Sequence, residues 1–258
     1  MKRKWIRWVS WILLTPVLLF AILMVLLYIP PVQNLLRREV TAYASKATGM
    51  DIQIQRIDLR FPLNLLVRGV EVIQQPDTLL SLESLNVHVQ AIPLFKGKVE
   101  VDDITLKNVV VNSANLIEGM KIQGVLGQFL LESHGVDLPN QVAVVNRAEL
   151  SDTHVQLLMN DTTTTPKDTT ATSPINWKID LHQLKLNNIS FSMELPTDSM
   201  KMAAHIGEAT INEGRADLKN QSYGLKQFLL SGASASYDTG NAEPAKGFDA
   251  SHIAVRDI

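Results

Sequence analysis

The residues that could do chemistry in this chain are six histidines and a neighbouring aspartate pair, Asp102 and Asp103. No two histidines are spaced as His-x-His or His-x-x-x-His, the short spacings that bring two imidazoles onto one metal ion. The sequence therefore favours surface or rim positions over metal ligation for all six, namely His88, His134, His154, His182, His205 and His252.

Signatures of the common catalytic sites are also missing from the sequence. There is no Gly-x-Ser-x-Gly motif, no P-loop and no dinucleotide fingerprint. Neither a histidine nor a third carboxylate can be assigned as a partner of the aspartate pair. The chain has no cysteine, so it has neither disulfides nor thiolate metal sites. We expect no enzymatic activity, no bound metal and no cofactor.

The first thirty residues are predicted to form a cytoplasmic tail and a membrane anchor. Four cations within the first seven residues precede an apolar run from Trp11 to Ile29. A helix of that length rises about 28 Å, close to the hydrocarbon thickness of a bilayer, and the cations place the N-terminus in the cytoplasm. A cleaved signal peptide is the alternative. Its candidate cleavage site, at 42–44, lies well beyond an apolar run that is already long for a signal core.

The remainder of the chain is acidic and large enough for a folded domain. The net charge of the whole chain is −2, and leaving out the four anchor cations makes it −6. That balance argues against a nucleic-acid partner, which would need a basic surface. About 228 residues follow the anchor, enough for one large or two small domains.

Residues 31–49 are predicted to form a short amphipathic helix that ends at Gly49. Its apolar stripe consists of Val32, Leu35, Leu36, Val40, Tyr43 and Ala47. The stripe could lie on a membrane surface, or it could plug the end of the fold that follows. We favour the plug because Glu39 interrupts the basic side of the helix.

From residue 50 onward the sequence predicts strands. Apolar and polar residues alternate in segments such as "MDIQIQRIDLRF" and "LNVHVQAI", with turn residues between segments. The segment 115–135 contains three glycines and is predicted to be mostly strand. Residues 160–174 are Thr-rich and aperiodic, and we expect an exposed loop within the strand domain of residues 50–258.

One irregularity recurs in these strands. In "ITLKNVVV" the apolar positions Ile104 and Leu106 are followed by Val109 and Val111, so one position is skipped. A skipped position would turn the later side chains to the opposite face of the sheet. An extra residue with positive φ at a bulge or bend cancels that reversal, so one face stays apolar.

The residue before the resumed apolar pattern is Gly, Asn or Asp, the types that adopt positive φ most readily. The predicted pivots are Gly69, Asn108, Asp152, Asn188 and Asp257, with a weaker copy at Gly214. Recurrence at such intervals predicts stacked β units rather than one closed globule.

The anchor, the segments "PVQNLLRREV" and "KATGMDIQIQRIDLRFPLNLLVRGVEV", and the repeated "LKN-V-V" steps resemble the AsmA-like family. The similarity is greatest to the TamB branch, the inner-membrane component of the translocation and assembly module. It implies an elongated curved β-sheet, a β-taco or groove of stacked repeats, preceded by a transmembrane helix and a short amphipathic helix.

The same resemblance implies a protein of a Gram-negative inner membrane with its bulk in the periplasm. Its expected function is to conduct phospholipid toward the outer membrane along an apolar groove. The alternative is a scaffold for insertion or secretion of outer-membrane β-barrel proteins with an Omp85-type partner. About a dozen strands would span only about 60 Å, so we expect the chain to be the N-terminal portion of a longer protein.

The apolar residues of the predicted strands are the candidates for lining such a groove, or else an ordinary sandwich or solenoid core, which periodicity does not distinguish. They are Ile52, Ile54, Ile57, Leu59, Val70, Val72, Val87, Val89, Ile104, Leu106, Val109, Val111, Ile189 and Phe191.

Overall fold

The structure is a computed structural model that describes residues 29–60, 63–90, 93, 100–114, 116, 119–137, 140–159, 176–239 and 252–258. The predicted anchor, apart from Ile29, and the predicted Thr-rich loop lie outside these residues. Within them, no helix combines the length and the apolar character that crossing a membrane requires.

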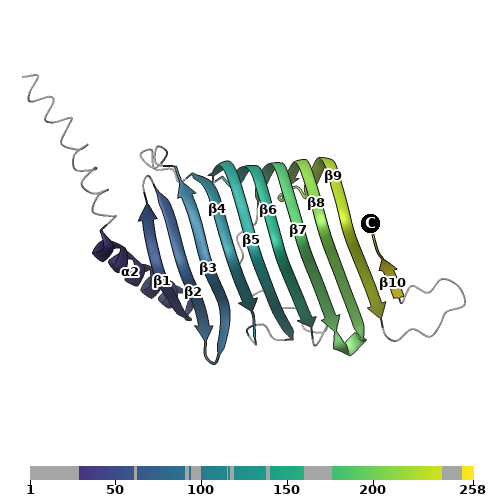
Figure 1. Cartoon of the computed structure of the whole chain (residues 1–258), viewed down its shortest axis with the longest axis horizontal. Helices are drawn as coiled ribbons and strands as arrows, with labels where there is room; N and C mark the ends of the chain where they lie inside the picture. Colours follow the sequence, from purple (N-terminus) through teal and green to yellow (C-terminus); the bar gives the residue numbers. More distant parts are fainter. Residues whose placement is uncertain are drawn as a thin grey trace, which may run out of the picture.

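A single ten-stranded sheet follows one helix, and its strands lie side by side in chain order (Figure 1). The elements are α2 (Pro30–Thr48), β1 (Asp51–Arg60), β2 (Asn64–Gln74), β3 (Asp77–Val89), β4 (Val101–Asn112), β5 (Met120–Asp137), β6 (Val142–Met159), β7 (Lys178–Leu195), a 3-10 turn η1 (Pro196–Asp198), β8 (Met200–Asp217), β9 (Ser222–Thr239) and β10 (His252–Val255). All neighbours are antiparallel except β6 and β7, which are parallel. The predicted mainly β class and the curved sheet are confirmed, including strand structure in most of 115–135.

Helix α2 begins and ends close to the predicted residues. Pro30 and Pro31 occupy its first positions, where a missing N–H removes no intrahelical bond. Gly49 follows its last residue with φ of 70°, and the Gly49 N–H donates to the Ser45 carbonyl. This left-handed cap ends the helix, and two residues, Gly49 and Met50, separate the helix from β1.

Polar side chains of α2 attach the helix to the outer edge of β1, which has no strand on that side. The Ser45 Oγ accepts the Ile52 N–H at 3.0 Å and also lies 3.4 Å from the Ile52 carbonyl oxygen. The remaining contacts are Arg37 Nη1 to the Ile54 carbonyl at 3.0 Å and Gln33 Nε2 to the Leu59 carbonyl at 3.2 Å. The helix thus satisfies backbone groups that a free strand edge would expose.

The prediction that the apolar stripe of α2 plugs the fold is wrong for most of the stripe. Leu36 packs against the apolar cluster formed by Ile54, Ile57 and Val67. Leu35, Val40 and Tyr43 are exposed, Tyr43 by 77 %. The polar side of the helix has docked instead, because the strand edge offers unpaired carbonyl and amide groups.

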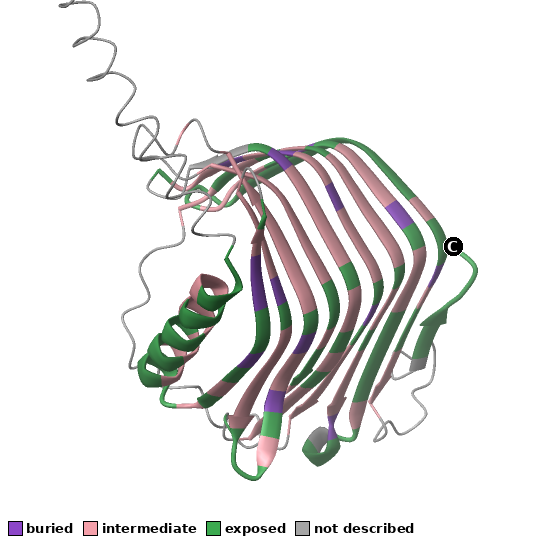
Figure 2. Ribbon diagram, turned by 60° about the vertical axis from the view of Figure 1, so that its left-hand side comes forward, coloured by how far each residue is buried: buried purple, intermediate pink, exposed green. Residues whose placement is uncertain are grey.

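Every long strand bends along one line that runs across the sheet, and Figure 2 shows the strands turning together. The pairings on either side of the bend fix the residues that form this line, which we call the crease. From β1 to β9 they are Gln55, Gly69, Glu83, Asn108, Gly127, Asp152, Asn188, Gly207 and Gly232.

Left-handed backbone at the crease occurs in strands of one direction. The crease residues of β2, β4, β6, β7 and β9 have φ between 49° and 61°. Those of the opposite-running strands β1, β3, β5 and β8 do not have positive φ. All five predicted pivots therefore have positive φ, and Gly232 is a further one that the sequence analysis missed.

The crease is not a bulge of two residues opposite one, because each of nine strands contains the extra residue at the same height. Between β1 and β2, for example, Ile54 pairs with Val70 and Ile57 with Val67, without a change of register. Asp257 differs. Val255 pairs with Ala235, yet Ile258 exchanges backbone bonds with Ala233, so two residues there oppose one.

A second crease crosses the later strands, where the register passes through Asn146, His182, Glu213 and Lys226. Its left-handed residue is Glu213, with φ of 54°, and not the predicted Gly214. The Glu213 carboxylate lies 3.2 Å from His182 Nδ1 and 3.9 Å from Lys226 Nζ. Glu213 takes this left-handed conformation between His182 and Lys226, which stand on the two neighbouring strands.

Two glycines at the main crease are required because neighbouring backbones approach closely. A Cβ atom on Gly127 would lie 2.7 Å from the Asp152 Cβ and 3.0 Å from its carbonyl oxygen. One on Gly207 would lie 3.1 Å from the carbonyl oxygens of Ser231 and Gly232. A side chain on Gly127 would force its neighbours to shift, whereas one on Gly207 would need them to give by a few tenths of an ångström.

We expect Gly127→Ala to lower the free energy of unfolding by about 1–3 kcal/mol, because the added methyl overlaps backbone that cannot move alone. Gly224→Ala is the matched control, since a Cβ atom there meets nothing within 4 Å. Urea denaturation of both variants measures the difference. Equal stability of the two variants would contradict the close approach at the crease.

The hydrogen bond with His182, followed by attraction to Lys226 and Arg215, lowers the pKa of Glu213 below its usual value of 4.5. A carboxyl group with a lowered folded-state pKa stabilises the fold above its unfolded pKa, and this contribution disappears as the pH falls through the folded value. Glu213→Gln should therefore lose less stability than the wild type between pH 6 and pH 3, measured by thermal unfolding. The same pH dependence in Glu213→Gln and in the wild type would contradict this contribution.

Ser45→Ala should speed hydrogen exchange of the Ile52 amide, which then loses its acceptor. Exchange at Val70, on the strand beyond β1, should remain at its wild-type rate. Amide exchange followed by NMR reports both positions. Unchanged exchange at Ile52 would mean that α2 does not seal the strand edge.

Candidate functional site

The sheet pairing gathers the apolar side chains into four rows on one face. The row beside the crease contains Ile54, Val70, Leu82, Val109, Leu126, Thr153, Ile189, Ile206 and Ala233. The row across the crease contains Ile57, Val67, Leu85, Leu106, Phe129, Leu150, Leu186, Ala209 and Leu230. We call the surface formed by all four rows the apolar face.

Two outer rows extend this face. One contains Leu59, Leu65, Val87, Ile104, Leu131, Ala148, Leu184, Ile211 and Phe228. The other contains Ile52, Val72, Leu80, Val111, Gly124, Val155, Phe191, Ala204, Ala235 and Val255. None of the four rows contains a charged residue.

The opposite face of the same strands is mostly polar. One of its rows contains Arg56, Arg68, Ser84, Lys107, Gln128, Ser151, Asn187, Glu208 and Ser231. We call this surface the polar face. The extra residue at the crease keeps apolar and polar side chains on separate faces. Without it, the part of each strand after the crease would place its apolar side chains on the polar face.

The sheet bends toward the apolar face. A corner brings together the side chains on its inner side, and several of the buried residues flank the main crease on the apolar face, including Ile57, Leu82 and Ala209. Crease residues such as Glu83 and Asn108 are exposed. The apolar face is therefore the concave one, and the polar face is convex.

Nothing in the described part of the chain covers most of the apolar face. No large side chain there is fully buried, and Val111, Phe191 and Phe228 are exposed by 36 %, 38 % and 51 %. Helix α2 contacts the face only at the β1 end, through Leu36. The result is one layer of sheet where most domains have two or three.

Each of the fourteen predicted lining residues belongs to the apolar face. Thirteen lie in the four rows, and Val89 continues the same alternation two positions after Val87, paired with Val101. The predicted lining residues include none from β5, β6, β8 and β9, whose contributions include Phe129, Leu150 and Phe228. Their signal was the same skipped position, in "VLGQFLL", but with the crease residue first in the skipped pair because β5 runs the other way.

The titratable groups form surface pairs on the sheet. His88 Nδ1 lies 3.3 Å from the Asp103 carboxylate, a histidine partner that the sequence did not identify. Asp102 accepts a hydrogen bond from Gln90. No group of three or more possible metal ligands occurs among residues whose positions are described. The arrangement can therefore bind apolar ligands along the concave face, and it shows no cluster suited to metal chemistry within that part of the chain.

Comparison with family models and with curated proteins identifies no relative of this chain. No family model matches the sequence, and no curated protein matches it.

Proposed function

We propose that the apolar face binds the acyl chains of phospholipids and conducts them along the sheet. The observation that carries the proposal is the uncovered concave surface of four uncharged rows, continuous from β1 to β9. Each buried methylene of a lipid contributes about 0.8 kcal/mol. The open side of the bend leaves room for headgroups to stay in water.

The resemblance to the AsmA-like family extends the proposal to a cellular setting. The protein would be anchored in the inner membrane by residues 11–29, with its sheet in the periplasm, and would carry phospholipid toward the outer membrane. In support, α2 begins directly after the apolar run, and Leu36 of α2 contacts the first apolar cluster of the sheet. The lipid path would start beside the membrane anchor.

Scaffolding of outer-membrane β-barrel assembly with an Omp85-type partner is the second candidate function. It is favoured by the edge of β9, where, within the described part of the chain, β10 pairs with the second half of the strand only. Residues in the first half are exposed, Tyr223 by 68 % and Leu225 by 53 %. A free strand edge of this kind can add a strand from a partner.

Val109→Asp should remove co-purifying phospholipid. A carboxylate in the row beside the crease would lose its hydration when an acyl chain covers it, and that loss disfavours lipid binding. Val110→Asp is the matched control, since Val110 is the next residue and is exposed on the polar face. Native mass spectrometry with lipid extraction on the purified full chain counts the lipids. We expect several lipids per wild-type chain, a similar number for Val110→Asp and fewer than about half as many for Val109→Asp.

Phe191→Glu provides a second variant at an exposed position of the face, where folding is less at risk. Circular dichroism and thermal unfolding establish that each variant is folded. A folded wild-type chain without lipid, or equal lipid content in the Val109 and Val110 variants, would overturn the lipid proposal. Capture of a barrel partner that is equally strong in all these variants would then favour the scaffold.

A further inference from the structure

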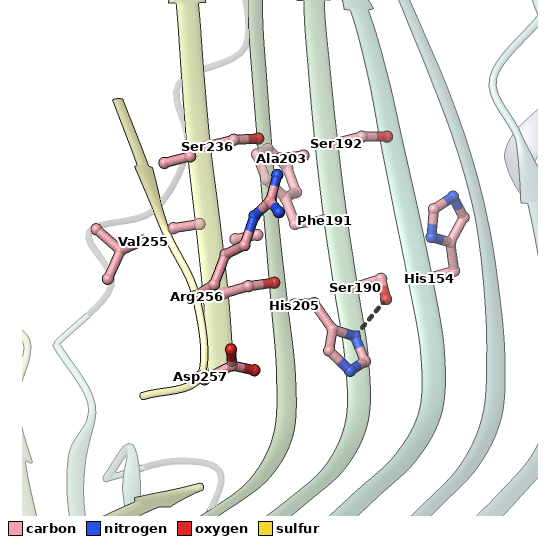
Figure 3. Close-up of a pocket in the computed structure, with 14 residues that line it drawn as sticks. His154, Ser190, Phe191, Ser192, Ala203, His205, Ser236, Val255, Arg256 and Asp257 are labelled. Carbon is pink, nitrogen blue, oxygen red and sulfur yellow. Dashed lines mark hydrogen bonds between the residues drawn. The ribbon is translucent and has the colours of Figure 1, made fainter. Parts of the chain in front are cut away.

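A hollow of about 490 Å³ lies over β6 to β10 (Figure 3). Most of its lining residues belong to the polar face, where His154, Ser190, His205 and Ser234 stand opposite one another on consecutive strands. Four residues of the apolar-face rows complete the lining, namely Phe191, Ala204, Ala235 and Val255. Arg256, which follows β10, lines the same hollow. The hollow is therefore lined by five groups able to donate hydrogen bonds, one from each of five neighbouring segments.

Small side chains create the space between these groups. The next row on the polar face contains Ser192, Ala203, Ser236 and Ala254, all of which line the hollow. Figure 3 shows Arg256 extending across β9 toward Ala203. Because Arg256 extends over serine and alanine side chains, the hollow is shallow and has a guanidinium donor at its rim.

The donors are either oriented or free to bind. His205 Nδ1 lies 3.0 Å from Ser190 Oγ, which fixes the imidazole plane over the row. Neither Arg256 nor His154 has an ion-pair partner among the residues that the structure describes. Arg56, Arg147 and Arg215 each contact a carboxylate, whereas Arg60 and Arg68, like Arg256, have no ion pair among the described residues.

One carboxylate, Asp257, also lines the hollow. Asp152, near His154, is occupied by a hydrogen bond from Asn188 Nδ2 at 2.7 Å. The remaining polar groups are the guanidinium, two imidazoles and serine hydroxyls. A guanidinium with hydroxyl and imidazole donors matches the several acceptor oxygens of a phosphate, and charge-assisted bonds to it are the strongest of their kind.

We propose that this hollow binds the phosphate group of a phosphate ester, with Arg256, His205 and His154 as the principal contacts. The phosphate could belong to a soluble ester or to a lipid headgroup, and both present the same oxygens. The site lies on the convex polar face, opposite the proposed acyl-chain surface. It therefore stands independently of lipid conduction.

The test uses the full chain in phosphatidylcholine nanodiscs, with the histidine imidazole signals followed by NMR. Glycerol 3-phosphate is the soluble probe, and nanodiscs that contain phosphatidic acid present the same monoester on a lipid. Arg256→Gln removes the guanidinium. Arg215→Gln is the control, because it removes an equal charge from an exposed arginine outside the hollow.

We expect saturable shifts of His154 and His205 with either probe, an affinity about tenfold weaker in Arg256→Gln, and unchanged affinity in Arg215→Gln. A response to glycerol 3-phosphate identifies a soluble ester as sufficient, whereas a response to phosphatidic acid alone identifies the lipid headgroup. Equal shifts at all six histidines, equal weakening in both arginine variants, or no response to either probe would overturn the site. Lipid content by mass spectrometry should stay at its wild-type value in Arg256→Gln.

Discussion

The whole arrangement depends on one constraint, which is that every strand must gain its extra residue at the same height. A strand that bends without the extra residue would present its apolar side chains on opposite faces before and after the bend. A strand that gained it at another height would lose register with its neighbours. The line from Gln55 to Gly232 meets both requirements, so bending and a continuous apolar surface become compatible.

A sheet of one layer must obtain its stability differently from a packed domain. Its described residues include no fully buried large side chain. Much of its stability therefore comes from the backbone hydrogen bonds between long neighbouring strands. The corner at the crease supplies the local burial that a second layer would otherwise provide. At the β1 edge, Ser45 and Arg37 take the place of a neighbouring strand. The remaining apolar area is available to ligands.

Sequence patterns predicted the parts of the fold that depend on local chemistry. The pivots Asn108, Asp152 and Asn188 could be recognised because left-handed backbone restricts the residue types. Crease residues in the opposite direction, such as Gln55 and Glu83, have no such restriction, so only the skipped apolar position marks them. Gly232 was missed because the adjoining Ala233 and Ala235 are weak markers of an apolar pattern.

Other features depend on contacts that no local pattern encodes. The apolar stripe of α2 indicated an amphipathic helix. Unpaired backbone groups on β1 decided which side of the helix docks, and hydrophobic periodicity does not predict such groups. The row of His154, Ser190 and His205 joins residues up to 51 positions apart, and only the strand register brings them together. The strand register places Glu213, and not Gly214, at the second crease, where the backbone is left-handed.

The constant register along the crease has a consequence for how such a chain can change in evolution. Because each strand from β1 to β9 repeats the main crease, the bend of the sheet at this line does not depend on the number of strands. Duplication or loss of one hairpin would change the length by about 10 Å while leaving the profile seen by a bound chain unaltered. Selection can therefore change the length of the sheet without changing its preference for a ligand.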